Sequence, residues 1–163
     1  MFGESAPRAT VRIVDFHPRY AHLFRDLNYE WLEEFFEVEP YDRIVLGDPQ
    51  KHIIRHGGCI LFAQVKREIV GTCALQKHTE KKYELAKMGV SSKHRGNGIG
   101  HALAKAAIER ARTLGAHKLV LATSPQLLAA NHLYESLGFE YVDISEIGPL
   151  PYKRESVVMS LEL

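Results

Sequence analysis

The sequence predicts a single domain of the α/β (α+β) class, in which one mixed, mostly antiparallel sheet carries helices on both faces. Strand-like and helix-like segments follow one another in the order β, α, α, β, β, β, α, β, α, β, β, a pattern that such a sheet buries best. The 163 residues fit one domain, residues 1–163, with its own core. A content of 45% hydrophobic and 25% charged residues is ordinary for a globular protein.

The first third of the chain contains one expected strand and two helical regions. Thr10–Asp15 alternates apolar and polar side chains, as a half-buried strand does. From His17 to about Val38 the apolar side chains have helical spacing, in one or two pieces. We expect this region to end at Glu39-Pro40, because a residue before proline resists the α conformation. Asp48-Pro49 resembles an N-cap followed by proline, which predicts a short helix through about Arg55.

The remaining elements follow from the same two periodicities. Lys66-Arg67-Glu68 separates two apolar runs and indicates a hairpin. One apolar stripe and a terminal Gly115 predict an amphipathic helix over Gly98–Leu114. The expected elements are the strands Cys59–Val65, Ile69–Lys77 and Lys82–Val90, the helix Gly98–Leu114, the strand Lys118–Ala122, the helix Gln126–Leu137, and the strands Phe139–Ile144 and Ser156–Leu161.

Charge and apolar patterning exclude several classes of function. The 21 Lys and Arg residues balance 20 Asp and Glu residues at a net charge of +1, so no basic excess indicates a nucleic-acid partner. No apolar run approaches the roughly 20 residues that span a bilayer. Met1–Arg8 lacks the apolar stretch of a signal peptide. We therefore expect a cytoplasmic protein without a membrane or nucleic-acid partner.

Cysteines and histidines give no sign of a metal site. Cys59 and Cys73 lie in apolar runs, so we expect them to be small core residues in a reducing compartment. His52 and His56 are spaced to share a helix face, but no third ligand accompanies them. We expect no metal cofactor.

The segment that carries chemistry is a glycine-rich turn between a strand and a helix. Three glycines let backbone N–H groups approach a ligand closely, at a helix N-terminus that favours an anion. Lys93, His94 and Arg95 add positive charge beside Gly96-Asn97-Gly98-Ile99-Gly100. We expect this segment to bind a phosphate or pyrophosphate. The alternative is an ordinary tight turn into a helix that binds no ligand. The turn is neither a Walker A loop nor a GxGxxG motif.

Three motifs in order resemble the GNAT superfamily of acetyl-CoA-dependent N-acetyltransferases. Arg95–Gly100 matches its R/Q-x-x-G-x-G/A motif, and the strand ending in Met88-Gly89-Val90 is similar to its fourth strand. Leu133–Phe139 resembles its LYxxLGF signature. The chain also resembles a subgroup of small bacterial members, some of them fused to MarR-type regulators, through Leu46–Pro49, Glu84–Met88 and Pro151-Tyr152.

The resemblance implies acetyl-CoA as cosubstrate and a GNAT-like sheet whose fourth and fifth strands splay apart. The pantetheine arm would lie in that gap and pair with the main chain of Met88, Gly89 and Val90, where a backbone N–H would also polarise the thioester carbonyl. The pyrophosphate would be held by Arg95, Gly96, Asn97, Gly98, Ile99 and Gly100.

Two residues are the expected catalytic groups. Glu84, on the strand before the turn, is the candidate general base that takes a proton from the attacking amine. A cross-strand ion pair is the alternative role for Glu84. Tyr134 is the candidate acid for the leaving thiolate, and a packed aromatic is the alternative.

The superfamily's usual Asn is replaced here by Leu127, and Asn131, one helical turn further on, is expected to supply the missing cofactor contact. Tyr29, Trp31 and Tyr152 are the candidates for the acceptor pocket. Residues 30–42 hold six acids and no base, which is either an acidic wall for a cationic amine or a solvated helix face.

The expected reaction is direct transfer of an acetyl group to a primary amine of a small molecule or amino acid. A protein lysine or N-terminal acetyltransferase is one alternative, and a non-catalytic acyl-CoA sensor is another. Because dimers are common in the superfamily, a homodimer is the expected assembly.

Overall fold

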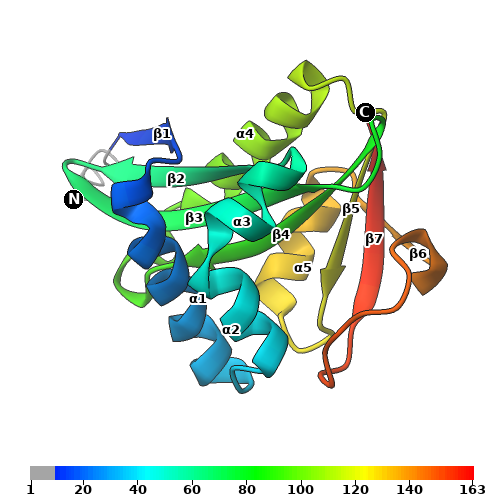
Figure 1. Cartoon of the computed structure of the whole chain (residues 1–163), viewed down its shortest axis with the longest axis horizontal. Helices are drawn as coiled ribbons and strands as arrows, with labels where there is room; N and C mark the ends of the chain where they lie inside the picture. The colour runs from blue at the N-terminus through cyan, green and yellow to red at the C-terminus, as the bar shows by residue number, and fades with distance from the viewer. Residues whose placement is uncertain (1–9) are drawn as a thin grey trace, which may run out of the picture.

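The computed structural model describes residues 10–163, so the expectation that Met1–Arg8 is not a signal peptide lies outside the described residues. The strands form one seven-stranded sheet in the order β1-β2-β3-β4-β5-β7-β6 (Figure 1). Within residues 10–163, β4 and β5 pair in parallel and every other neighbouring pair is antiparallel. The predicted mixed, mostly antiparallel sheet is therefore confirmed. The strands are β1 Val11–Asp15, β2 Cys59–Val65, β3 Glu68–Lys77, β4 Lys82–Val90, β5 Lys118–Thr123, β6 Glu140–Val142 and β7 Val157–Glu162.

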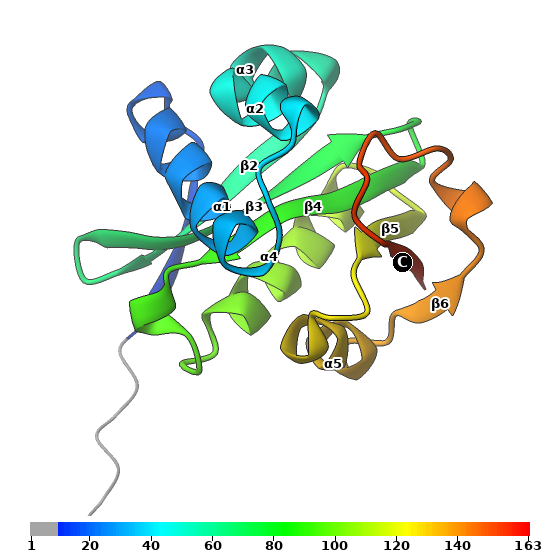
Figure 2. The ribbon, with the colours of Figure 1, turned by 90° about the horizontal axis from the view of Figure 1, so that it is seen from below.

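Helices cover both faces of the sheet, as Figure 2 shows. On one face lie α1 (Ala21–Phe35), α2 (Pro40–Gly47) and α3 (Pro49–His52); on the other lie α4 (Ile99–Thr113) and α5 (Leu128–Ser136). Strand alternation divides the core accordingly. In β2, Ile60 and Phe62 pack with the first group of helices, whereas Leu61 and Ala63 face the α4 side.

The cysteines are structural, as expected. Cys73 is fully buried, and burial raises the pKa of its thiol well above the ordinary value. Cys59 is half-buried at the edge of the same core cluster. Within residues 10–163, none of the helices is long and apolar enough to cross a membrane.

The segment from Pro40 to Gly47, to which the sequence analysis assigned no element, forms the helix α2. The first long helix already ends at Phe35, and Pro40 begins α2 rather than ending the preceding one. Proline is tolerated in the first turn of a helix, where its missing N–H would have no partner. A reciprocal capping box between Glu39 and Asp42 fixes this start.

The arrangement of β4 positions the site. Its register with β3 slips between Thr72 and Ala74, so β4 carries a bulge, and Lys87 within it has a left-handed φ of 56°. Pairing with β5 stops at Glu84, opposite Val120. Beyond that point the two strands separate, as the resemblance implied, and one edge of the β4 backbone is left without a strand partner.

Candidate active site

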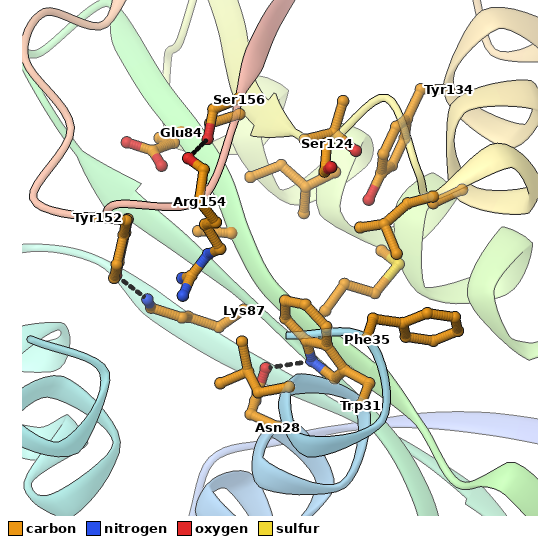
Figure 3. Close-up of a pocket in the computed structure, with 18 of the residues that line it drawn as sticks. Asn28, Trp31, Phe35, Glu84, Lys87, Ser124, Tyr134, Tyr152, Arg154 and Ser156 are labelled. Carbon is orange, nitrogen blue, oxygen red and sulfur yellow. Dashed lines mark hydrogen bonds between the residues drawn. The ribbon is translucent and has the colours of Figure 1, made fainter. Parts of the chain in front are cut away.

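A cavity of about 1000 Å³ opens where β4 and β5 separate. Its walls come from α1, α2, β4, the glycine turn, α5 and the loop of residues 147–156 that precedes β7. Figure 3 shows side chains from α1, β4, α5 and the loop before β7 around this cavity. The expected site residues that line the cavity are Trp31, Glu84, Met88, Val90, Arg95, Gly96, Gly98, Ile99, Gly100, Tyr134 and Tyr152.

The glycine turn presents a helix N-terminus to the cavity. Gly96 and Gly98 adopt left-handed φ values of 80° and 78°, which glycine allows without strain. Gly98 is the N-cap of α4 and supplies no side-chain cap, so the first-turn N–H groups remain available to a ligand. Beside the turn, Nδ1 of His94 is buried and has no hydrogen-bond partner within residues 10–163. The turn therefore fits an anion such as a diphosphate.

Carboxylates of α1 hold the turn in place. Nη1 of Arg95 donates to Glu34 at 2.7 Å, and its Nε donates to the carbonyl of Val90 at 3.3 Å. The Glu30 carboxylate accepts the backbone N–H of Ser92 at 2.6 Å. These acids of the 30–42 segment are thus neither a free acidic wall nor a purely solvated face. They orient Arg95 toward α1 at the rim of the cavity.

Two of the expected cofactor residues, Asn97 and Gly89, contact the backbone of neighbouring segments. The Asn97 amide donates to the carbonyl of His94 at 3.1 Å, inside the turn. At Gly89, an added Cβ would lie 2.8 Å from the Leu27 carbonyl oxygen, so glycine is required where β4 packs against α1. Neither residue lines the cavity.

Glu84 is the last residue of β4 that pairs with β5, and its side chain is 15% exposed. Nε2 of His78, which follows β3, lies 2.8 Å from Oε1 of Glu84. Both residues line the cavity. Glu84 therefore forms a cross-strand pair and also lines the cavity. No sequence motif indicated that His78 would be its partner.

Tyr134 projects from α5 with its hydroxyl directed into the cavity (Figure 3). Its ring packs edge-on against Phe139 at a centroid distance of 5.8 Å. Burial raises the pKa of the phenol above its ordinary value, which keeps it protonated near neutral pH. Tyr134 is thus a packed aromatic side chain whose hydroxyl lines the cavity, and its role as the acid stays a prediction.

Asn131 is buried and does not line the cavity. Its Oδ1 accepts from Thr123 at 2.8 Å, and its Nδ2 donates to the carbonyl of Ser124 at 3.0 Å. In this structure the amide joins α5 to the end of β5. A cofactor contact by Asn131 stays a prediction.

The three aromatic candidates for the acceptor pocket lie in different places. Trp31 lines the cavity, and its Nε1 donates to Oδ1 of Asn28 at 3.0 Å. Tyr29 does not line the cavity and packs beside Arg43 at the edge of the α1–α3 core. Tyr152 lines the cavity from the loop before β7.

The sequence analysis missed a charged network at this wall, which we call the Lys87–Arg154 network (Glu39, Asp42, Lys87, Tyr152 and Arg154). Arg154 donates two hydrogen bonds of 2.9 Å to the carboxylate of Asp42 and one of 3.2 Å to Glu39. Nζ of Lys87 donates to the hydroxyl of Tyr152 at 2.5 Å. The network ties the loop before β7 to α2 across the cavity.

Within residues 10–163, no group of three or more His, Cys, Asp or Glu side chains is placed to hold a metal ion.

Sequence and structure comparisons place this architecture in a known family. The sequence profile of the Acetyltransferase (GNAT) family matches residues 20–139, and the chain belongs to that family. It is 34% identical over 121 residues to N-acetylaspartate synthetase of Xenopus tropicalis, a match that covers 73% of this chain and 45% of that protein. The chain thus spans less than half the length of this relative.

Solved structures share the fold. A GNAT-family acetyltransferase of Staphylococcus aureus superposes with a TM-score of 0.84 at 17% identity, over 94% of this chain and 99% of that chain. A GNAT-family acetyltransferase of Elizabethkingia anophelis, described with acetyl-CoA bound, superposes with a TM-score of 0.62 at 23% identity. This match covers 94% of this chain and 98% of that chain. The expected fold and the acetyl-CoA-dependent acyltransferase class are confirmed at the level of the family. The bacterial MarR-related subgroup, the homodimer, the cytoplasmic location and the absence of nucleic-acid and membrane partners stay predictions.

Proposed function

We propose that this protein transfers the acetyl group of acetyl-CoA to the primary amine of a small molecule, with amino acids as the first candidates. The observation that carries the proposal is the cavity itself, which joins the glycine turn, the gap between β4 and β5, Glu84 and Tyr134 in one continuous space. The name of the N-acetylaspartate synthetase relative directs the choice of acceptors to amino acids.

The chain offers a matching site for coenzyme A. The N-terminus of α4, with Gly98 as its N-cap, would hold the diphosphate, and the His94 imidazole adds a buried nitrogen beside it. The β4 edge from Met88 to Val90, free of β5, would pair with the amides of the pantetheine arm. When bound, acetyl-CoA supplies an activated carbonyl carbon and a thiolate leaving group.

Glu84 and Tyr134 divide the proton transfers. An alkyl amine has a pKa near ~10.4, so it must lose a proton before it can attack. Glu84, paired with His78, accepts that proton before the attack. The neutral amine then attacks the thioester carbonyl, the new C–N bond forms, the C–S bond breaks, and the second amine proton leaves to solvent. Tyr134, held protonated by burial, hydrogen-bonds the departing thiolate, passes its proton to it, and regains a proton from solvent.

The loop before β7 favours a small acceptor. Arg154 binds Asp42 through two hydrogen bonds, and the backbone N–H of Lys153 donates to Glu39 at 2.8 Å. These contacts hold the loop against the start of α2 at the wall of the cavity, which favours a small acceptor over a peptide that needs an open groove.

Chromatographic measurement of coenzyme A released from acetyl-CoA tests the proposal across amino acids, polyamines, aminoglycosides and peptides. Direct product detection avoids the reaction of Cys59 with a thiol-reactive dye. We expect release that depends on a small amine. Release only with peptides would indicate a protein acetyltransferase, and acetyl-CoA binding without any release would indicate a sensor; either result contradicts the proposal.

A further inference from the structure

The Lys87–Arg154 network contains more hydrogen-bond donors than its acceptors use. Arg154 has five guanidinium N–H groups, of which three donate to Glu39 and Asp42. Both N–H groups of Nη1 and one of Nη2 are thereby occupied. Within residues 10–163, no acceptor takes the Nε–H or the second N–H of Nη2. In a planar guanidinium these two N–H groups lie on one edge, the fork that binds a carboxylate through two parallel hydrogen bonds.

Lys87 is a second cation on the same wall of the cavity, and no carboxylate of residues 10–163 lies within hydrogen-bond distance of it. Its side chain is only 10% exposed, and the left-handed bulge of β4 places it in the cavity lining. Nζ donates to Tyr152, whereas the nearest carboxylate oxygen, on Asp42, is 3.8 Å away. An ammonium group with this little water gains strongly from a further anionic partner.

We propose that Lys87 and Arg154 together bind a carboxylate of the acceptor, which makes the acceptor an amino acid with a free carboxyl group. This inference rests on the proposed function. Glu84 and Lys87 belong to the same strand, and Figure 3 shows Glu84, Lys87 and Arg154 on one side of the cavity. A carboxylate held at Lys87 leaves the amine of the same small molecule beside the proposed base.

The charge state of Lys87 supports this role. Burial lowers the pKa of Lys87 to about 8, although the neighbouring Asp42 carboxylate acts in the opposite direction. The carboxylates already present therefore do not fully compensate the cost of burying this ammonium. A ligand carboxylate would supply the missing compensation and hold Lys87 in its charged form.

Calorimetric titration tests the inference without requiring turnover. L-Aspartate, L-alanine and L-alaninamide are titrated into protein saturated with coenzyme A; the last two differ only in the carboxyl group. We expect at least one amino acid to bind more tightly than L-alaninamide. Lys87→Met removes a hydrogen bond to a charged group, which should weaken that binding by about 10- to 100-fold. Binding of L-alaninamide should change little.

Two further variants make the result specific. Arg154→Lys keeps the charge but loses the fork, so it should also weaken amino-acid binding. Lys153→Met removes an exposed lysine from the same loop and should leave binding unchanged, and thermal denaturation verifies the fold of each variant. Equal binding of L-alanine, L-aspartate and L-alaninamide, or a preference that survives in Lys87→Met and Arg154→Lys, would overturn the inference. Carboxylate-selective binding without acetylation contradicts only the proposed function; acetylation without that selectivity contradicts only the inference.

Discussion

Nε2 of His78 lies 2.8 Å from Oε1 of Glu84, at the last residue through which β4 pairs with β5. The proposed base is thus fixed at the point where the two strands begin to separate and the cavity begins. The carboxylate thus has a paired residue of β4 behind it and the His78 imidazole beside it.

Replacing Glu84 tests the base directly. Glu84→Gln removes the carboxylate but keeps its size, so we expect kcat to fall by about 100-fold. The loss should be largest at low pH, where more of the amine acceptor is protonated. Steady-state kinetics from pH 6 to pH 9 measure this, and a pH profile parallel to that of the wild type would indicate another base.

Tyr134→Phe should lower kcat while it preserves the affinity for acetyl-CoA. The substitution deletes only the hydroxyl, and the edge-on packing against Phe139 is kept. Turnover and calorimetric binding of acetyl-CoA are measured on the same preparation. An unaltered kcat would remove Tyr134 from the acid role.

Gly98→Asp should abolish coenzyme A binding, because it places a carboxylate against the phosphate site at the start of α4. Gly115→Asp is the matched control. Gly115 also has a left-handed φ, 88°, but it follows the other end of the same helix and does not line the cavity. Both variants carry the same backbone strain. Equal coenzyme A affinity in the two variants would contradict the placement of the diphosphate.

The binding of carboxylate ligands should weaken above about pH 8. In that range Lys87, whose pKa is lowered to about 8, loses its charge. Its neighbours do not titrate there: burial raises the pKa of Tyr152, Arg154 stays charged, and Asp42 stays ionised. N-Acetyl-L-aspartate is the suitable probe, since it has no amine to titrate. Constant affinity from pH 7 to pH 10 would exclude Lys87 from carboxylate binding.

Asp42→Asn should destabilise the fold by about 3 kcal/mol at neutral pH, because it leaves the buried Arg154 guanidinium without its main partner. Burial opposes ionisation of Asp42, but hydrogen bonds from Arg154 and from the Glu39 N–H together lower its pKa. Because the pKa of Asp42 is lower in the folded state than in the unfolded state, its ionisation stabilises the fold at pH values above the unfolded-state pKa. This stabilisation is lost as the pH falls through the folded-state pKa. Urea unfolding should therefore show the two proteins converging below about pH 4. A difference in the free energy of unfolding that stays constant with pH would contradict a role of the Asp42–Arg154 ion pair in stability.

Much of the fold could be predicted from the sequence because its strands and long helices follow simple periodicities. The amphipathic stripe of α4 and the hairpin between β2 and β3 lie where the pattern indicated. The segment from Pro40 to Gly47 was missed because a proline marks the start of a helix as readily as the end of one. Helix ends and the short β6 differ from expectation by a few residues, as local signals alone fix ends poorly.

The site was only partly predictable. The glycine turn and Glu84 belong to local motifs, whereas Arg154 and Asp42 are more than one hundred positions apart and meet only in the folded chain. Lys87 lies in the cavity because of a bulge, and strict alternation along β4 would not have placed it there. Nothing in the sequence around His78 marked it as a partner of Glu84.

Mass spectrometry of the reaction products tests the central claim most directly. The protein is incubated with acetyl-CoA labelled in the acetyl group and with an equimolar mixture of amino acids. The account predicts that the label appears on the amine nitrogen of a free amino acid, with release of one coenzyme A per product. Label that stays in acetyl-CoA, or that appears only on protein lysines or N-termini, would contradict it.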